Sequence, residues 1–289
     1  MNYLFHIFVM LEIYTLLALS ANQKVGLSGL LSLSQAVFYG MGAYAISIAI
    51  TKFQLSYWLA LPFAIVISAL TALIYSFIAG KVRELYFSLA TLAIQIIFSS
   101  IVYNWISVTN GPYGISGIAN PSILGININS PATFAIFGGF WVLSAIVFYN
   151  WFLKTPFCRL IEATRDDQIA LLSLGKNPNY YKRTSIIISA VIAGIAGSLY
   201  ATYTTYIDPS SFNLDESILI LSIVLIGGAG GIIGPVSGAI IYVLLPEILK
   251  FIQMPDRVAA NMRMIIFGLL LTLIVRFQPR GIFGKHEIQ

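Results

Sequence analysis

Side chains that could bind a metal or perform catalysis are few and scattered in this 289-residue sequence. The two histidines, His6 and His286, lie at opposite ends of the chain, and Cys158 is the single cysteine. A zinc site or an internal disulfide therefore lacks the ligands or thiols that it needs. No set of nucleophile, base and metal is visible that would serve a membrane enzyme, so we expect no catalytic residues and no metal.

A nucleotide-binding loop is also missing from the sequence. Such a loop needs Ser or Thr directly after a Gly-Lys pair. The three Gly-Lys pairs, which begin at Gly80, Gly175 and Gly284, are followed instead by Val, Asn and His. We therefore expect this chain not to hydrolyse ATP by itself.

Composition places the chain in a membrane. It is 58% hydrophobic and only 9% charged, whereas a soluble domain carries about 25% charged residues. Apolar runs long enough to span a bilayer recur along the chain, and their continuity excludes the alternating strands of a β-barrel. We predict an all-α, polytopic helical membrane protein. Its formal net charge of +5 is a topology signal rather than a sign of a nucleic-acid partner.

We expect residues 1–289 to form one transmembrane domain of about eight segments. The first segment, Tyr3 to Ser20, is expected to be retained, because no basic residue precedes it, although "ALSA" at Ala18 to Ala21 loosely resembles a cleavage site. Two further apolar regions are rich in glycine and are predicted to be broken or re-entrant: 28–50 and 218–249. The clear spans are 3–20, 57–79, 86–107, 132–153, 184–206 and 259–276.

Charges between the spans predict their orientation. Basic residues gather in the links 80–85 and 154–183 and in the C-terminal tail, so these parts are expected in the cytoplasm. The link 108–131 has no charge, and the link 207–217 has only acids, so both are expected outside. Region 218–249 is too short for two full crossings, which need about 40 residues. We predict that it makes no net crossing, with a half-helix from 218 to about 226 and a second piece from 235 to 249.

The glycine break at Gly227, Gly228, Gly230 and Gly231 has two interpretations. Non-helical backbone at membrane depth is tolerated where it lines a wet cavity, and broken helices mark substrate pathways in transporters. Small residues also allow helices to pack closely, without any pathway. Both interpretations stay open, and they can coexist. A weak internal repeat would make "SQAVFYGMGAYA" at 34–45 the counterpart of this break.

One acid, Glu12, lies clearly inside a span. An intramembrane charge is a functional candidate by default. A proton-driven pump needs a relay, however, so pairing with a neighbouring helix or a partner chain is the simpler explanation for this glutamate.

The link 154–183 is the most informative soluble segment. Pro156 can begin a helix, and Gly175 with Pro178 beyond it can end one. Apolar residues recur at helical spacing between acids, which predicts an amphipathic helix or helix pair. A helix on the lipid surface is usually rich in Lys and Arg, and an anionic leaflet would repel the acids found here. A protein partner is therefore favoured over the lipid surface.

Five segments, taken in order, closely resemble the permease subunits of branched-chain amino acid ABC importers. The match is to the second of their two permease types, within the wider family that also serves urea and short amides. It covers nearly the whole chain. The segments are "GLSGLLSLSQAVFYGMGAYA" (26–45), "YFSLATLAIQ" (86–95), "TNGPYGISGI" (109–118), "IEATRDDQIALLSLGKN" (161–177) and "PSSFNLDESILILSIVLIGGAGGIIGPVSGAIIYVLLPEIL" (209–249).

The resemblance implies a multi-pass subunit of the bacterial inner (plasma) membrane with a cytoplasmic C-terminus. A sister permease, two cytoplasmic ATPases that bind ATP and Mg²⁺, and a periplasmic binding protein would complete the importer. The link 154–183 would then hold the coupling helix, and the importer would move a branched-chain amino acid, or another small polar solute such as urea, by alternating access. The coupling residues implied are Glu162, Ala163, Arg165, Asp166, Asp167 and Gly175. The candidate path residues are Gln35, Tyr39, Thr91, Gln95, Gly227, Gly228, Gly230 and Gly231.

Two alternatives remain at this stage. Gln95 could serve only as an interhelical hydrogen bond worth about 1 kcal/mol. The whole chain could also act alone, as a secondary transporter or channel for a small polar solute, in which case Glu12 is the only candidate for its ion or proton site.

Overall fold

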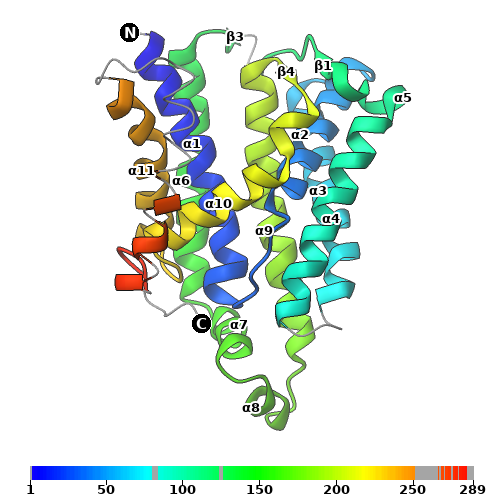
Figure 1. Ribbon diagram of the computed structural model, residues 1–289. Coiled ribbons are helices and arrows are strands. Elements are labelled where there is room, and N and C mark those ends of the chain that lie inside the picture. The colour runs from blue at the N-terminus through cyan, green and yellow to red at the C-terminus, as the bar shows by residue number, and fades with distance from the viewer. Residues whose placement is uncertain are drawn as a thin grey trace.

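The computed structural model is a bundle of long helices with a small helical projection at one end (Figure 1). It describes residues 2–79, 84–123 and 126–250, with 266, 268–269, 271–274, 276–278 and 280–284. In this part of the chain, five helices are long and apolar enough to cross a membrane. The prediction of an all-α, polytopic membrane protein is confirmed. Those five spans are Asn2–Leu27, Tyr57–Phe77, Tyr86–Asn104, Pro131–Leu153 and Pro178–Thr204.

Five of the six clear predicted spans correspond to helices. The last one, 259–276, lies mostly outside the described residues. The first helix ends in a π-helical turn, η1, which is an uncommon distortion often found at functional sites. The helices are α1 (Asn2–Asn22) with η1 (Gln23–Leu27), α3 (Tyr57–Ala79), α4 (Glu84–Asn104), α6 (Pro131–Leu153) and α9 (Pro178–Thr204).

The two ends of the bundle carry different structural elements. At one end lie the N-terminus and two short antiparallel strand pairs; at the other end α7 (Pro156–Asp166) and α8 (Gln168–Ser173) project away from the bundle (Figure 1). We call these the strand end and the α8 end. The first strand pair joins β1 (Ile115–Ser116) to β4 (Tyr206–Ile207), and the second joins β2 (Ser122–Ile123) to β3 (Ile126–Asn127). The strand end also carries α5 (Ile106–Thr109) and a 3₁₀ turn, η2 (Gly111–Tyr113). A second 3₁₀ turn, η3 (Pro209–Phe212), follows β4 and leads into the bundle towards Gln95 of α4.

Region 28–50 is helical only in its second part. Residues 28–34 form an extended stretch beside η1, and α2 (Gln35–Thr51) then runs to the strand end (Figure 1). Region 218–249 divides as predicted into α10 (Leu214–Gly227) and α11 (Ile233–Lys250), with the glycine break between them.

Contacts with α1 fix the directions of these last helices. Asn22, near the end of α1, bonds to the backbone of Gly230 and Gly231, whereas Tyr3, at its beginning, bonds to Glu247 of α11. The chain therefore runs along α10 to the α8 end and returns along α11 to the strand end. This region makes no net crossing, in agreement with the prediction.

The internal repeat has a different correspondence from the one predicted. α1 and α9 are antiparallel, since Ser20 meets Ser189 and His6 meets Tyr203. α1 is followed by a non-helical stretch and then α2, and α9 is followed by a non-helical stretch and then α10. The starts of α2 and α10 lie side by side. The counterpart of the start of α2 is thus the start of α10, and not the glycine break at the far end of α10.

Several helices begin with the same local device. Ser130, Thr155 and Asn177 each accept a hydrogen bond from a backbone N–H of the first turn, and a proline follows directly. Such caps satisfy N–H groups that have no partner inside the helix, and proline at the first position has no N–H to satisfy.

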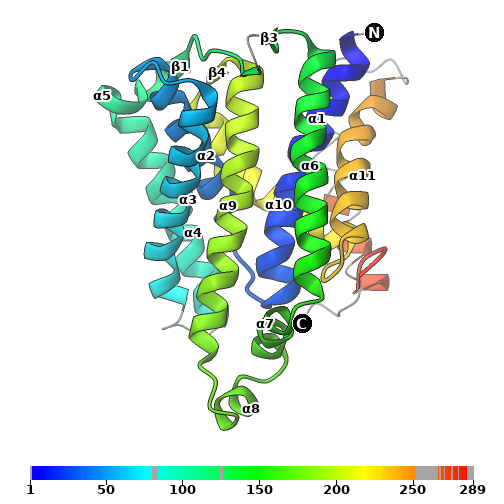
Figure 2. The ribbon, with the colours of Figure 1, turned by 180° about the vertical axis from the view of Figure 1, so that it is seen from behind.

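The core lies where α9 crosses α1, α2 and α3, and Figure 2 shows α9 from behind, between α6 and the α2–α3 pair. Glycines let α2 and α9 approach closely. A Cβ on Gly42 would overlap the backbone of Gly194, and one on Gly197 would overlap the carbonyl of Tyr39. Close backbone contact of this kind is a main source of helix association in lipid, where burial of apolar surface gives little driving force.

Candidate functional site

Two helices, α2 and α10, begin inside the bundle rather than at its ends; Ser217 joins their starts and is itself bonded to a side chain of α4. The N–H of Ala36, in the first turn of α2, donates to Ser217 Oγ of α10 over 2.9 Å. Ser217 Oγ donates in turn to Gln95 Oε1 at 3.0 Å, and Gln95 Nε2 donates to the carbonyl of Phe212 at 2.9 Å. Gln95 lies near the middle of α4, so this junction is at mid-depth of the bundle.

The extended stretch before α2 finds its hydrogen bonds within the protein. Thr91 Oγ1 accepts from Leu33 N at 3.0 Å, and Ser88 Oγ donates to Leu31 O at 2.9 Å. The fully buried Lys24 bonds to Ser32 Oγ at 3.1 Å. Backbone groups without a partner cost several kcal/mol in hydrocarbon, so these side chains are what permit a non-helical stretch at this depth.

The predicted path residues fall into three places. Gln95 and Tyr39 lie at the junction, because the Tyr39 ring packs on Phe212 with 5.0 Å between centroids. Gln35 and Thr91 are buried next to the junction, on its side towards the α8 end. There Gln35 Nε2 donates to Ser20 Oγ, and Thr91 supports the extended stretch. The four glycines of the break lie at the α8 end, away from the other four residues.

A polar face leads from the junction towards the strand end. A pocket of about 370 Å³ on this face is lined by four residues of α4, one residue of η2 and three residues at the start of η3. Asp208 Oδ1 accepts from Ser211 Oγ at 2.6 Å, and Ser211 Oγ accepts from the Tyr200 hydroxyl at 3.3 Å. The lining residues are Ser99, Ser100, Tyr103, Asn104, Pro112, Asp208, Pro209 and Ser210.

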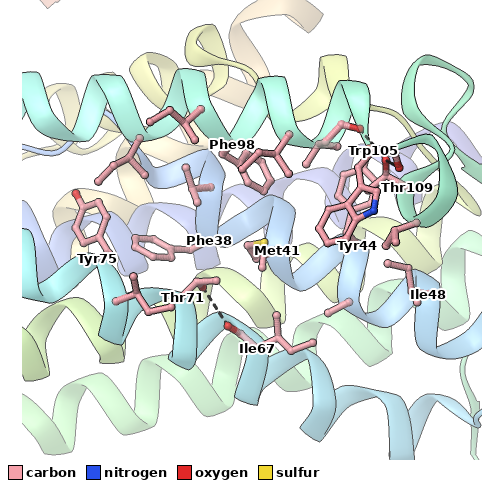
Figure 3. Close-up of a pocket in the computed structure, with 18 residues that line it drawn as sticks. Phe38, Met41, Tyr44, Ile48, Ile67, Thr71, Tyr75, Phe98, Trp105 and Thr109 are labelled. Carbon is pink, nitrogen blue, oxygen red and sulfur yellow. Dashed lines mark hydrogen bonds between the residues drawn. The ribbon is translucent and has the colours of Figure 1, made fainter.

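The opposite side of α4 is apolar. A cleft of about 580 Å³ between α2, α3 and α4 is lined almost entirely by apolar and aromatic side chains such as Phe38, Met41 and Phe98 (Figure 3). Thr71 turns its hydroxyl back to the carbonyl of Ile67 in its own helix. This cleft offers little to orient a polar solute, so α4 separates an apolar side from a polar one.

The glycine break is held from two directions. Asn22 Oδ1 accepts from Gly230 N at 2.8 Å, and its Nδ2 donates to Gly231 O at 2.8 Å. From the C-terminal segment, Ile282 N and Phe283 N donate to the carbonyls of Ile226 and Gly227. These carbonyls are among those that the last turn of a helix leaves without a partner, so the tail completes the end of α10.

The predicted coupling segment is a pair of short helices. Asp167 accepts from Ile169 N and Ala170 N and thereby begins α8, and Gly175 follows its end with a φ of +72°. Arg165 Nη1 donates to Gly26 O of η1 at 2.8 Å, and its Nη2 pairs with Asp166 at 3.0 Å. Ala163 and Glu162 lie half-buried on α7. The prediction of a helix pair at 154–183 is confirmed.

Glu12 lies apart from the polar face. Its carboxyl fits against Gly138 and Gly139 of α6, where a larger residue would overlap it. Its Oε2 is buried and accepts no hydrogen bond from the described residues.

Sequence reasoning missed most of the polar face. Ser99 and Tyr103, like Ser100 and Asn104, are four residues apart, and residues at that spacing share a helix face. This regularity in an otherwise apolar span was the available signal. Asp208 and Glu216 were recognised only as charges of an outer link, because nothing in the sequence places that link against α4. The described residues contain no group of three or more His, Cys, Asp or Glu that could hold a metal ion.

Similarity to known proteins covers almost the entire chain. Residues 3–275 match the family of branched-chain amino acid transport system permease components. No solved structure gives a significant match.

Relatives include the high-affinity branched-chain amino acid transport system permease protein LivM of Salmonella typhimurium, 31% identical over 97% of this chain and 70% of the relative. LivM of Escherichia coli is also 31% identical, over 96% of this chain and 69% of the relative. The probable LivM of Methanocaldococcus jannaschii is 23% identical over 96% of this chain and 92% of the relative. This chain therefore belongs to the branched-chain amino acid permease family, whose members are the non-catalytic transmembrane subunits of ABC importers.

Proposed function

We propose that this protein is one of two permease subunits of an importer that carries branched-chain amino acids across the bacterial inner membrane. The names of its relatives support this substrate class; urea and similar small polar solutes are the alternatives within the wider family. The α8 end and the C-terminus face the cytoplasm, because the basic residues of the link 154–183 gather there.

The observation that carries the proposal is the exposed apolar surface of α8. Ile169, Leu172 and Leu174 are exposed by 77%, 57% and 74% at the end of the molecule that projects farthest from the bundle (Figure 1). Contiguous apolar side chains on a polar projection mark a protein interaction site. We assign this surface to a cleft of a cytoplasmic ATPase, with Asp166 and Glu162 at its rim.

A chain of contacts connects α8 to the helices that make the path. α7 carries α8 and is tied to η1 by Arg165, whose side chain also packs on Gly29. Directly before η1, the last residue of α1, Asn22, holds the glycine break. Movement of α8 would therefore reach both α10 and the extended stretch before α2, which is the requirement for alternating access driven by a separate ATPase.

The polar face of α4, η3 and the start of α10 supplies this subunit's half of the path. Polar side chains at membrane depth face a water-filled cavity or another protein rather than lipid. A sister permease placed against this face would enclose the polar groups from both sides, and a periplasmic binding protein would deliver the solute at the strand end.

The test compares exposed apolar residues at the two ends of the molecule. In proteoliposomes with the sister permease, ATPases and binding protein, the Ile169→Ser/Leu172→Ser variant should lose at least tenfold of its leucine uptake and of its binding-protein-stimulated ATPase activity. Tyr113→Ser, which removes a ring that is 82% exposed at the strand end, should leave the ATPase coupling unchanged. Normal coupling in the α8 variant would refute the docking assignment.

Of the two aspartates in this helix pair, only Asp166 is suitable for a test of charge. Asp167→Lys removes the N-cap of α8 and would disturb the helix itself. Asp166→Lys changes the charge at an exposed position outside that cap, so it reports on attraction to the ATPase. We expect a several-fold loss of coupling that high salt reproduces in the wild type.

A transporter or channel that acts alone is the second candidate, and no observation favours it. Glu12, the ion site that the sequence suggested for it, lies on the far side of α1 from the polar face. Leucine uptake by this subunit alone in liposomes would support this candidate and contradict the importer.

A further inference from the structure

One carboxylate on the polar face has an unusual environment. Glu216 lies in the first turn of α10, directly before Ser217 of the junction, and is half-buried. The Tyr14 hydroxyl of α1 is placed to donate to this carboxylate. The hydroxyls of Tyr39 and Tyr200 lie close enough for its charge to act on them.

Aromatic rings from five elements pack around this position. Tyr14 meets Tyr242 of α11 edge to face, with 4.6 Å between centroids. Tyr39 of α2 meets Tyr200 of α9 at 5.5 Å and Phe212 of η3 at 5.0 Å. Glu216 therefore sits between two aromatic groups at the place where α2 and α10 begin.

No basic side chain neutralises this carboxylate within the described part of the chain. The ion pair of Arg165 with Asp166 lies at the α8 end of the molecule. A carboxylate at membrane depth is costly unless a cation, a donor or water accompanies it, and one tyrosine hydroxyl compensates only part of that cost.

A structural role for Glu216 explains only part of this arrangement. An acid in the first turn stabilises a helix through its dipole, and Asn213 caps α10 by accepting from Glu216 N. Asp215 occupies the same turn, however, and is exposed to solvent. One acid would suffice for the dipole, and the dipole does not require tyrosines from three other helices.

The cluster is partly open at the surface of the chain and is connected by hydrogen bonds to the strand end. Glu216, Tyr14 and Tyr200 are all half-buried rather than enclosed. Tyr200 continues towards the strand end through Ser211 to Asp208. A solute that enters at the strand end would meet Asp208 first and Glu216 at the junction.

We propose that Glu216 and its tyrosines bind the ammonium group of the solute while it crosses the junction. Carboxylates pair with ammonium ions, and the faces of tyrosine rings attract cations. This inference rests on the proposed function and adds that the permease itself holds the protonated amino group of an amino acid. A solute without an ammonium group, such as urea, would gain nothing from this subsite.

The first test uses uptake by the complete importer. Glu216→Gln keeps the shape and removes the charge, so leucine uptake should fall at least tenfold, and Glu216→Asp should retain part of it. Asp215→Asn is the matched control, because it removes an acid from the same helix turn, and it should leave uptake within twofold of the wild type. Thermal stability should stay equal in all three variants. Unchanged uptake in Glu216→Gln, or an equal loss in Asp215→Asn, overturns the subsite.

The second test reads the site directly. An apolar carbodiimide should label Glu216 and Glu12 in the wild-type importer, as mass spectrometry can measure. The cation 3-methylbutylammonium should reduce labelling of Glu216 at least fivefold, whereas the anion 4-methylpentanoate, which has a similar apolar part, should not. Labelling of Glu12 should be the same in the presence of either compound. Equal labelling of Glu216 with either probe contradicts the proposal.

The two proposals fail in different ways. If the wild-type importer moves no leucine, the proposed function is wrong. If it moves leucine and Glu216→Gln moves it equally well, only the ammonium subsite is wrong.

Discussion

The starts of α2 and α10 are the same structural device in two chemical settings. Both helices begin at mid-depth, and Ser217 joins them. The start of α2 is fully buried among hydroxyl and amide groups, with Gln35 bonded to Ser20. The start of α10 is half-open and carries Glu216 among tyrosines, with Asp215 exposed beside it. The first is built to anchor the backbone, whereas the second is built to meet a solute.

Their far ends differ as well. α2 ends at the strand end beside Lys52, whose Nζ donates to Ser107 O. α10 ends at the glycine break, where Asn22 and the C-terminal segment hold it, and η1 then connects to Arg165 of α7. Of these two far ends, only that of α10 is connected to the exposed surface of α8, so changes at the far end of α10 should cost more than changes at the far end of α2.

The largest effect on stability is expected at the break itself. Gly228 has a φ of +105°, and a Cβ there would overlap the backbone of Gly284. Strain and overlap together should make Gly228→Ala destabilising by about 3 kcal/mol, measured as the free energy of unfolding in mixed micelles. Gly231→Ala is the control, since its Cβ would meet nothing within 4 Å, and it should cost under about 0.5 kcal/mol. Equal stability of the two variants would mean that the break does not hold this geometry.

An intermediate loss of stability is expected at the start of α10, and a smaller one at the start of α2. Gln95→Leu leaves Phe212 O, and one bond of Ser217, without a partner at the start of α10, so the free energy of unfolding should fall by about 2 kcal/mol. Gln35→Leu acts at the start of α2 and should cost about 1 kcal/mol or less. There Ser20 and Ser189 keep their bonds to each other, and Gln35 Oε1 has no partner to lose. A larger loss for Gln35→Leu would reverse the comparison.

The smallest effects are expected where α7 meets η1. Arg165→Ala removes a charged hydrogen bond to Gly26 O and should cost about 1 kcal/mol of stability. Asp166→Ala removes the exposed partner of the Arg165 ion pair and should change stability by less than about 0.5 kcal/mol. Chemical denaturation of both variants, alongside their ATPase coupling, checks this order. Arg165→Ala with full stability and full coupling would break the proposed connection from α7 to the glycine break.

Composition and local pattern were enough to predict much of the architecture. Long apolar runs must become helices in lipid, because only a helix or a closed barrel satisfies every backbone group there. The caps and stops around Pro156 and Gly175 are likewise local, so the helix pair of the link could be predicted from neighbouring residues. The length of region 218–249 and the charges around it were sufficient to predict a broken pair without net crossing.

Tertiary structure alone decided which polar residues meet. Thr91 and Gln95 are one helix turn apart, yet Thr91 supports the stretch before α2 while Gln95 bonds to Ser217 and Phe212 at the start of α10. Glu216 comes beside Tyr14 and Tyr39, from helices distant in sequence, only because α10 begins where α2 begins. A sequence determines the period, the caps and the total polarity of each helix by local physics. The depth at which two broken helices meet depends on how whole helices pack, through contacts such as those of Gly42 with Gly194, and these have no local signature.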